Sequence, residues 1–299
     1  MIKYALLGGL ALLALRSPVK AQDSSTAIAP PGNRIAFRNA FIQKLDSLFV
    51  HQQYAAIVAE CKKEQPDYNR KAAGFNYLAA CYFMGETERA LALLDHSMQT
   101  CPNTFAILDI LTGDYTGYRQ LLEVPEVKAH LMTGIYQKLD EETLSDKEHA
   151  RALLACIIAD QWNRYMSSGA TMRLSKTRFP YPHLEDRSTT QAKSKQISTD
   201  VFEWYQKTGK LFSKAEVGSL YPYQLLLLFH EPDLSRRAYY LELLQAAVQQ
   251  DIFPLVQEIN FRIATELAAA GDISSLPSPE LVERYRKLYN MPDYQYAFF

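Results

Sequence analysis

The chain has 299 residues, of which 48% are hydrophobic and 22% are charged, and its net charge at neutral pH is −1. This balance excludes the strongly basic surface typical of proteins that bind nucleic acids or anionic membranes. The length is sufficient for one large hydrophobic core or two smaller ones. No Gly-x-Gly-x-x-Gly, His-Glu-x-x-His or Cys-x-x-Cys pattern occurs, so the sequence predicts no nucleic-acid partner, no cofactor and no metal site.

Residues 1–21 have the layout of a secretory signal peptide. Lys3 supplies positive charge, an uncharged run extends from Tyr4 to Leu15, and Ala21 is the small residue at the expected cut. The run would span about 18 Å as a helix, which is short for a bilayer core about 30 Å thick. We therefore expect cleavage after Ala21 and export to the periplasm or the extracellular space. No later segment is apolar for long enough to predict an integral membrane helix.

After the signal peptide, residues 22–34 are rich in Ser, Ala and Pro, and we expect them to form a flexible leader. Helical periodicity begins near Ile35, and no later segment shows the alternation of a strand. Gly and Pro residues interrupt the pattern at short intervals. The predicted fold class is therefore all-α, built from many helices of about 10–20 residues.

The segment from Phe75 to Pro102 is the clearest helical hairpin in the sequence. Gly85 separates its two helices, and small residues at Ala79 and Ala90 would let the helices approach closely. The facing positions of the two helices are Phe75, Leu78, Ala79 and Tyr82, followed by Ala90, Leu94 and Ser97. A weaker copy precedes this hairpin, with Phe41, Leu45 and Leu48 followed by Tyr54, Ile57 and Val58.

This pattern resembles the tetratricopeptide repeat over about residues 36–103, although one residue is missing before Gly85. The resemblance implies a region of stacked helical hairpins, which we place at residues 35–143, with further helices at 115–122 and 125–139 completing the stack. It also implies a concave surface near Phe75 and Tyr82 that binds a peptide or protein.

A second helical domain is predicted over residues 144–299. Ser145 and Glu148 form a capping-box pattern before an apolar helix that should end near Gly169. An irregular insertion is expected at residues 169–188, which contain prolines at alternate positions. The later helices are expected at 189–208, 221–230, 234–250, 254–270 and 279–289, with a second capping box at Ser213 and Glu216 and an aromatic tail that packs on the helices.

Four residues of this domain are candidates for a shared polar site: Asp160, Arg164, His230 and Arg262. Asp160 and Arg164 lie four residues apart and therefore on one helical face, and Arg262 follows Glu258 at the same spacing. Two interpretations stay open. The four residues either form ordinary ion pairs and a helix cap, or they line a catalytic pocket in which His230 is the general acid or base.

Residues 147–270 resemble an uncharacterised bacterial all-helical domain of unknown function. The positions that carry this resemblance are Asp160–Gln161, Arg164, Asp200, Lys214–Gly218, Leu228–His230, Asp233 and Arg262. The chain departs from the pattern at Asn260 and Phe261, where an acid next to Arg262 is expected, and at its tail, where Pro292 to Tyr294 replace a glycine-containing segment. The resemblance implies a fold and no established activity.

The four cysteines are Cys61, Cys81, Cys101 and Cys156. In an exported protein they could form disulfides, with Cys61–Cys101 as the first pair to test, or remain buried thiols.

Together these patterns leave two main functions open. One is an exported helical scaffold that binds a peptide or protein partner through the region of Phe75 and Tyr82. The alternative is an enzyme of unknown reaction that uses a His/Asp/Arg pocket in the C-terminal domain. A purely structural envelope protein is a third hypothesis.

Overall fold

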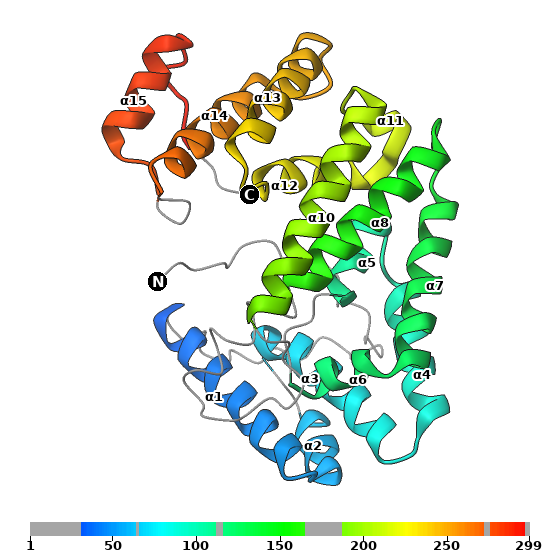
Figure 1. Ribbon diagram of the computed structural model, residues 1–299. Coiled ribbons are helices and arrows are strands. Elements are labelled where there is room, and N and C mark those ends of the chain that lie inside the picture. The colour runs from blue at the N-terminus through cyan, green and yellow to red at the C-terminus, as the bar shows by residue number, and fades with distance from the viewer. Residues whose placement is uncertain (1–30, 64–65, 112–115, 165–186, 272–275, 297–299) are drawn as a thin grey trace, which may run out of the picture. The chain divides into compact units, whose positions relative to one another are not determined.

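The computed structural model describes residues 31–63, 66–111, 116–164, 187–271 and 276–296 (Figure 1). Within these ranges the chain forms helices and no strand, which confirms the all-α class. The α-helices are α1 (Pro31–Val50), α2 (Tyr54–Cys61), α3 (Asp67–Phe83), α4 (Thr87–Gln99), α5 (Thr104–Leu111), α6 (Thr116–Glu123), α7 (Pro125–Glu141), α8 (Lys147–Arg164), α10 (Arg187–Thr208), α11 (Lys214–Val217), α12 (Tyr223–Phe229), α13 (Leu234–Gln249), α14 (Leu255–Ala269) and α15 (Pro279–Leu288). A short 3-10 helix, η2 (Gly218–Leu220), lies between α11 and α12.

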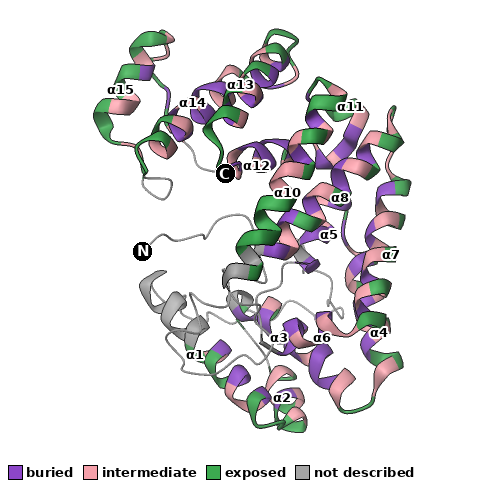
Figure 2. Ribbon diagram, in the orientation of Figure 1, coloured by how far each residue is buried: buried purple, intermediate pink, exposed green. Residues whose placement is uncertain are grey.

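The chain divides into two compact units. The N-terminal unit contains α1 to α7 and ends at Glu141, and the C-terminal unit begins at Glu142 and contains α8 and α10 to α15. Figure 2 shows buried residues along the helices of each unit. The expected signal peptide, most of the leader and the core of the expected insertion lie outside the described residues. Helix α1 begins at Pro31, within the range expected for the leader, and α10 begins at Arg187, within the range expected for the insertion.

Helix α3 is the centre of the N-terminal unit, where it packs against α1, α2, α4 and α6. The ring of Phe75 lies 4.3 Å from the ring of Tyr118 at the start of α6. Further along α3, the hydroxyl of Tyr82 donates a hydrogen bond to Glu126, in the first turn of α7 and three residues after the end of α6. Because the contacts follow the same order in both segments, α6 runs parallel to α3.

Helices α4 and α7, the second helices of the two hairpins, also run in the same direction. Nε2 of His130 in α7 lies 2.6 Å from Oδ1 of Asp95 in α4, and one turn later Gly134 lies against Met98. Helix α7 therefore runs parallel to α4. The hairpins α3–α4 and α6–α7 thus lie side by side in the same orientation.

Helix α5 is an addition to this arrangement that the sequence pattern did not predict. It packs against α7 and α4. Its eight residues form a nearly continuous apolar run, TFAILDIL, in which a helical period cannot be distinguished from a buried strand.

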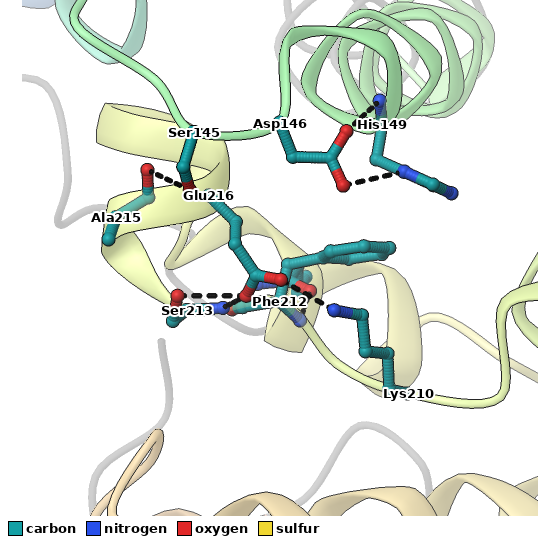
Figure 3. A network of polar contacts seen from close by, with 9 residues as sticks. Ser145, Asp146, His149, Lys210, Phe212, Ser213, Ala215 and Glu216 are labelled. Carbon is teal, nitrogen blue, oxygen red and sulfur yellow. Dashed lines mark hydrogen bonds and ion pairs between the residues drawn. The ribbon is translucent and has the colours of Figure 1, made fainter.

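The first helix of the C-terminal unit begins one residue later than expected, which makes the predicted Ser145–Glu148 capping box wrong. Asp146 caps α8, because its Oδ1 accepts a hydrogen bond from the His149 N–H at 3.1 Å. The Ser145 hydroxyl instead donates to the carbonyl of Ala215 at 3.1 Å, as Figure 3 shows. A contact distant in sequence therefore decides which of two good capping residues is used.

The second predicted capping box, at Ser213 and Glu216, is confirmed at the start of α11. Just after α11, Gly218 has a φ of 61°, and its missing side chain leaves room for the Glu142 carboxylate and Leu144. That carboxylate accepts hydrogen bonds from the N–H and the hydroxyl of Ser219, at 2.8 and 2.6 Å. The chain entering α8 is thereby attached to the segment before α12.

The C-terminal unit is closed by its last helices. Helix α14 packs against α12, α13 and α15. Tyr294 is buried in a cluster with Ile259, Ile263 and Tyr285, so the expected packing of the aromatic tail is confirmed for this residue. No helix within the described ranges has the length and apolar character that crossing a bilayer requires.

All four cysteines are free thiols, so of the two alternatives that the sequence left open the structure has the thiols, and Cys61 and Cys101 are not bonded. The Sγ atom of Cys101 lies 3.3 Å from the carbonyl of Ser97 in the preceding turn, to which the thiol donates. Burial raises the pKa of Cys61 to about 12.

Two glycines in helices of the N-terminal unit offer a matched test of this packing. A Cβ at Gly117 would clash with the Phe49 ring, whereas a Cβ at Gly74 would meet no atom within 4 Å. We expect Gly117→Ala to lower the free energy of unfolding by about 1–3 kcal/mol. Gly74→Ala should raise it by about 0.5–1 kcal/mol through helix propensity. Urea titration followed by circular dichroism measures both, and equal effects of the two substitutions would contradict the α1–α6 contact.

Candidate functional site

Asp160 and His230 lie in direct contact in the C-terminal unit, although 70 positions separate them in the sequence. Asp160 is in the fourth turn of α8 and is 8% exposed, and His230 is the C-cap residue directly after α12. Nδ1 of His230 lies 2.8 Å from Oδ2 of Asp160. The side-chain amide of Gln161 donates to the same oxygen at 2.9 Å.

This contact orients the imidazole. An ionised carboxylate only accepts hydrogen bonds. Nδ1 of His230 therefore carries a hydrogen and donates a hydrogen bond to Asp160. The Nε2 atom, on the opposite side of the ring, is then the nitrogen whose lone pair accepts a hydrogen bond or a proton. The pair thus has the geometry in which a carboxylate orients a histidine for proton transfer.

Arg262 has its described polar contacts elsewhere in the unit. Its Nε donates to Oε1 of Glu258 at 2.9 Å, which is the one-turn pairing that the sequence suggested. Tyr289 and Gln245 donate to the same carboxylate at 3.2 and 3.3 Å. Arg262 therefore belongs to a cluster that joins α14 to α13 and to the end of α15. The side chain of Arg164 lies outside the described residues.

A buried carboxylate that no sequence pattern indicated, Glu231, directly follows His230. Glu231 accepts hydrogen bonds from the Ser198 hydroxyl at 2.8 Å and from the Asp233 N–H at 2.9 Å. Nη1 of Arg236 lies 3.9 Å from Oε2 of Glu231 and donates to the Ser198 hydroxyl at 3.1 Å. Glu231 therefore attaches the end of α12 to α10 and to the start of α13.

Arg237 is a buried cation that the sequence pattern also did not indicate. It is 2% exposed, and Nε and Nη2 of its guanidinium donate to the carbonyls of Glu231 and Phe229 at 2.7 and 2.8 Å. Nη1 lies 3.3 Å from the Thr265 hydroxyl, and the guanidinium carbon lies 5.5 Å from the centre of the Phe261 ring. Burial lowers the pKa of Arg237, but an arginine stays protonated at neutral pH. Its charge caps the negative end of α12.

Cys156 lies one turn before Asp160 on α8. Burial, together with the charges of Asp200 and Asp160, raises its pKa to about 11. The thiol is therefore protonated at neutral pH and is not a nucleophile for the Asp160–His230 pair.

A second His–Asp contact lies at the start of α8 (Figure 3). Nδ1 of His149 lies 2.8 Å from Oδ2 of Asp146, and the His149 ring is 4.9 Å from the Phe212 ring. The Lys210 ammonium lies 2.5 Å from Oε1 of Glu216 and 5.0 Å from the centre of the Phe212 ring. Because Asp146 and Glu216 each cap a helix here, this network stabilises the local fold.

The two residues proposed for ligand binding differ in exposure. Phe75 is 3% exposed and packs on Tyr118, so it is a core residue. Tyr82 is half-buried and contacts Glu126. Of this pair, Tyr82 is the residue that can reach a ligand.

No group of three or more His, Cys, Asp or Glu side chains in the described part of the chain could hold a metal ion. No protein-family model, curated protein or solved structure matches the chain. The two family resemblances therefore remain predictions.

A double-mutant cycle at Asp160 and His230 tests the coupling of the pair. We expect Asp160→Asn and His230→Gln to be coupled by about 1–2 kcal/mol in unfolding free energy, because the contact is largely buried. The matched control is Asp95 with His130, whose side chains are 44% and 36% exposed. That pair should show coupling below about 0.5 kcal/mol. Equal coupling free energies in the two cycles would contradict the expectation that burial strengthens the contact between Asp160 and His230.

The pH dependence of stability should report on Glu216. Partial burial raises its pKa, but hydrogen bonds from Lys210 and Ser213 outweigh this effect and hold the pKa below its usual value. Its contribution is therefore present above the unfolded-state pKa of about 4.3 and lost as the pH falls through the lower folded-state value. We expect Glu216→Ala to cost about 1 kcal/mol at pH 7 and much less near pH 2, as measured by urea titration. A cost that is constant over this range would contradict the assignment.

Proposed function

We propose that the protein is an exported helical binding protein whose N-terminal unit takes a peptide or protein segment as its ligand. The observation that carries this proposal is the repeated orientation of the hairpins α3–α4 and α6–α7. When hairpins repeat in one orientation, the first helices of all hairpins lie on the same side of the stack. Together they form an extended surface that can bind a polypeptide. The charged start, short apolar run and small residue of residues 1–21 support export.

Helix α1 adds a third hairpin, α1–α2, to the two described above. It contacts α3, as a neighbouring hairpin in a stack would. It also contacts α6, whereas in a linear stack each hairpin contacts only its neighbours, so the three first helices pack more closely together than in such a stack. The three hairpins reach the minimum of about three units that a stacked array requires. The tetratricopeptide-like character of residues 36–103 is part of this proposal.

The ligand is expected to contact residues at the ends of the hairpins rather than the interior of α3. Phe75 is enclosed by the core, whereas Tyr82 lies in the last turn of α3 and is partly accessible. This assigns ligand binding to Tyr82 and to its neighbours, and assigns Phe75 a role in the stability of the stack.

A second candidate function is an enzyme in which His230 acts as general acid or base. The 2.8 Å contact between His230 and Asp160 favours it, because a carboxylate that fixes the imidazole prepares the opposite nitrogen for proton transfer. The reaction class would be proton transfer to or from a bound substrate. Arg262 takes no direct part in this scheme, because its contacts lie with Glu258.

The binding function is tested by selecting a random-peptide phage library on the immobilised mature chain, residues 22–299, recovered from the periplasm of a Gram-negative host. We expect an enriched motif whose synthetic peptide binds with a micromolar dissociation constant, as measured by fluorescence anisotropy. The mature chain should begin at Gln22 by mass spectrometry.

The variants Asp160→Asn and His230→Gln serve as controls in this assay, because both residues lie in the C-terminal unit. Their peptide affinity should equal that of the unmodified chain. A library that yields no shared motif would contradict the binding function. Peptide affinity that is lost in both variants would favour a site at Asp160 and His230 instead.

A further inference from the structure

The N-terminal unit exposes two large apolar side chains at neighbouring helix ends. Val50, at the end of α1, is 42% exposed, and Met84, directly after α3, is 37% exposed. Each follows a phenylalanine in the sequence, and the rings of Phe49 and Phe83 lie 5.4 Å apart. Each exposed residue is therefore next in sequence to one ring of an aromatic contact, in which Phe49 is buried and Phe83 is half-buried.

Partly exposed aromatic rings continue this surface. The Tyr54 ring lies 5.7 Å from the Phe83 ring at an interplanar angle of 22°, and 5.3 Å from the Phe49 ring. The Tyr82 ring lies 5.5 Å from the Phe83 ring. Tyr54, Tyr82 and Phe83 are all half-buried. We define the aromatic end patch as the five residues Val50, Tyr54, Tyr82, Phe83 and Met84.

The backbone on both sides of the aromatic end patch is held in a fixed conformation. The chain leaves α1 through Gln52 with a φ of 54° and leaves α3 through Gly85 with a φ of 87°. At the end of α1, the N–H of Gln53 donates to the carbonyl of Leu48. At the end of α3, the N–H of Glu86 donates to the carbonyl of Cys81. These two hydrogen bonds cap the C-terminal ends of the helices. A surface that is already ordered loses little conformational freedom when a ligand binds.

The patch borders a negative charge. The Tyr82 hydroxyl donates to Glu126, an exposed residue in the first turn of α7, and this hydrogen bond raises the pKa of Tyr82. Among the described residues no lysine or arginine forms an ion pair with Glu126. A ligand that places a cation beside an apolar anchor would therefore complement this surface in both shape and charge.

On this basis, and resting on the binding function proposed above, we propose that the aromatic end patch binds a cationic amphipathic peptide segment. An apolar side chain of the segment packs on Met84 and the neighbouring rings, and an adjacent lysine or arginine faces Glu126. An acidic peptide would lack that charge match.

The inference is tested with three synthetic 12-residue peptides labelled with fluorescein. One contains Leu, Lys and Gly, the second replaces every Lys with Glu, and the third replaces every Leu with Gly. We expect the first to bind the mature chain at least about tenfold more tightly than either of the others, and its affinity to fall as salt rises.

Two substitutions locate the site. Met84→Gln should weaken the Leu/Lys peptide about tenfold, because it removes the exposed apolar anchor. Glu126→Gln should weaken it about threefold and reduce its salt dependence, because the amide still accepts from Tyr82 but carries no charge. The control is Leu288→Gln at an exposed leucine of the C-terminal unit, which should leave the affinity unchanged.

The outcomes separate this inference from the binding function. If peptides selected from the phage library bind and neither Met84→Gln nor Glu126→Gln weakens them, the aromatic end patch is not the site, although the protein still binds peptides. Equal affinity for the Leu/Lys and Leu/Glu peptides would overturn the charge assignment. Concentration-dependent dimerisation that Met84→Gln abolishes, without peptide binding, would show that a second copy is the occupant.

Discussion

The guanidinium of Arg237 is the contact on which the C-terminal unit depends. A buried cation is costly unless its donors are satisfied, and removing one partner of such a group typically costs about 3–5 kcal/mol. Here the partners are the last carbonyl of α12, at Phe229, and the carbonyl of Glu231 two residues after the helix, so the charge and the helix end satisfy each other. Because His230 and Glu231 belong to that helix end, Arg237 determines where they lie. It is therefore a positioning residue for the Asp160–His230 pair.

Both units combine aromatic packing with buried polar contacts. In the C-terminal unit, Gln224 is fully buried, accepts from the Phe212 N–H at 2.7 Å and donates to the Phe212 carbonyl at 2.8 Å. Ring contacts such as that between Phe229 and Phe261 lie in the same unit. In the N-terminal unit, the buried Asn76 donates to the Ala72 carbonyl at 2.9 Å, and the Phe49 ring lies close to Gly117.

The sequence predicted local features well and distant contacts poorly. The helix starts at Leu234 and Pro279 follow residues that favour capping, so the pattern identified them within one residue. The Arg262–Glu258 pair was also visible, because a spacing of four places both side chains on one face. The contacts of Arg237 and the choice of Asp146 over Ser145 depend on segments brought together only by folding. Phe75 was misassigned because periodicity identifies an apolar face but not what covers it.

The chemistry of the free thiols has a kinetic consequence for a protein proposed to be exported. Only the thiolate attacks a disulfide, and burial raises the pKa of Cys61 and Cys156 to about 12 and 11. At pH 7 the reactive fraction is then on the order of one in ten thousand or less. Exchange with small oxidants would be correspondingly slow, and the folded chain would keep these sulfurs reduced in surroundings that favour their oxidation.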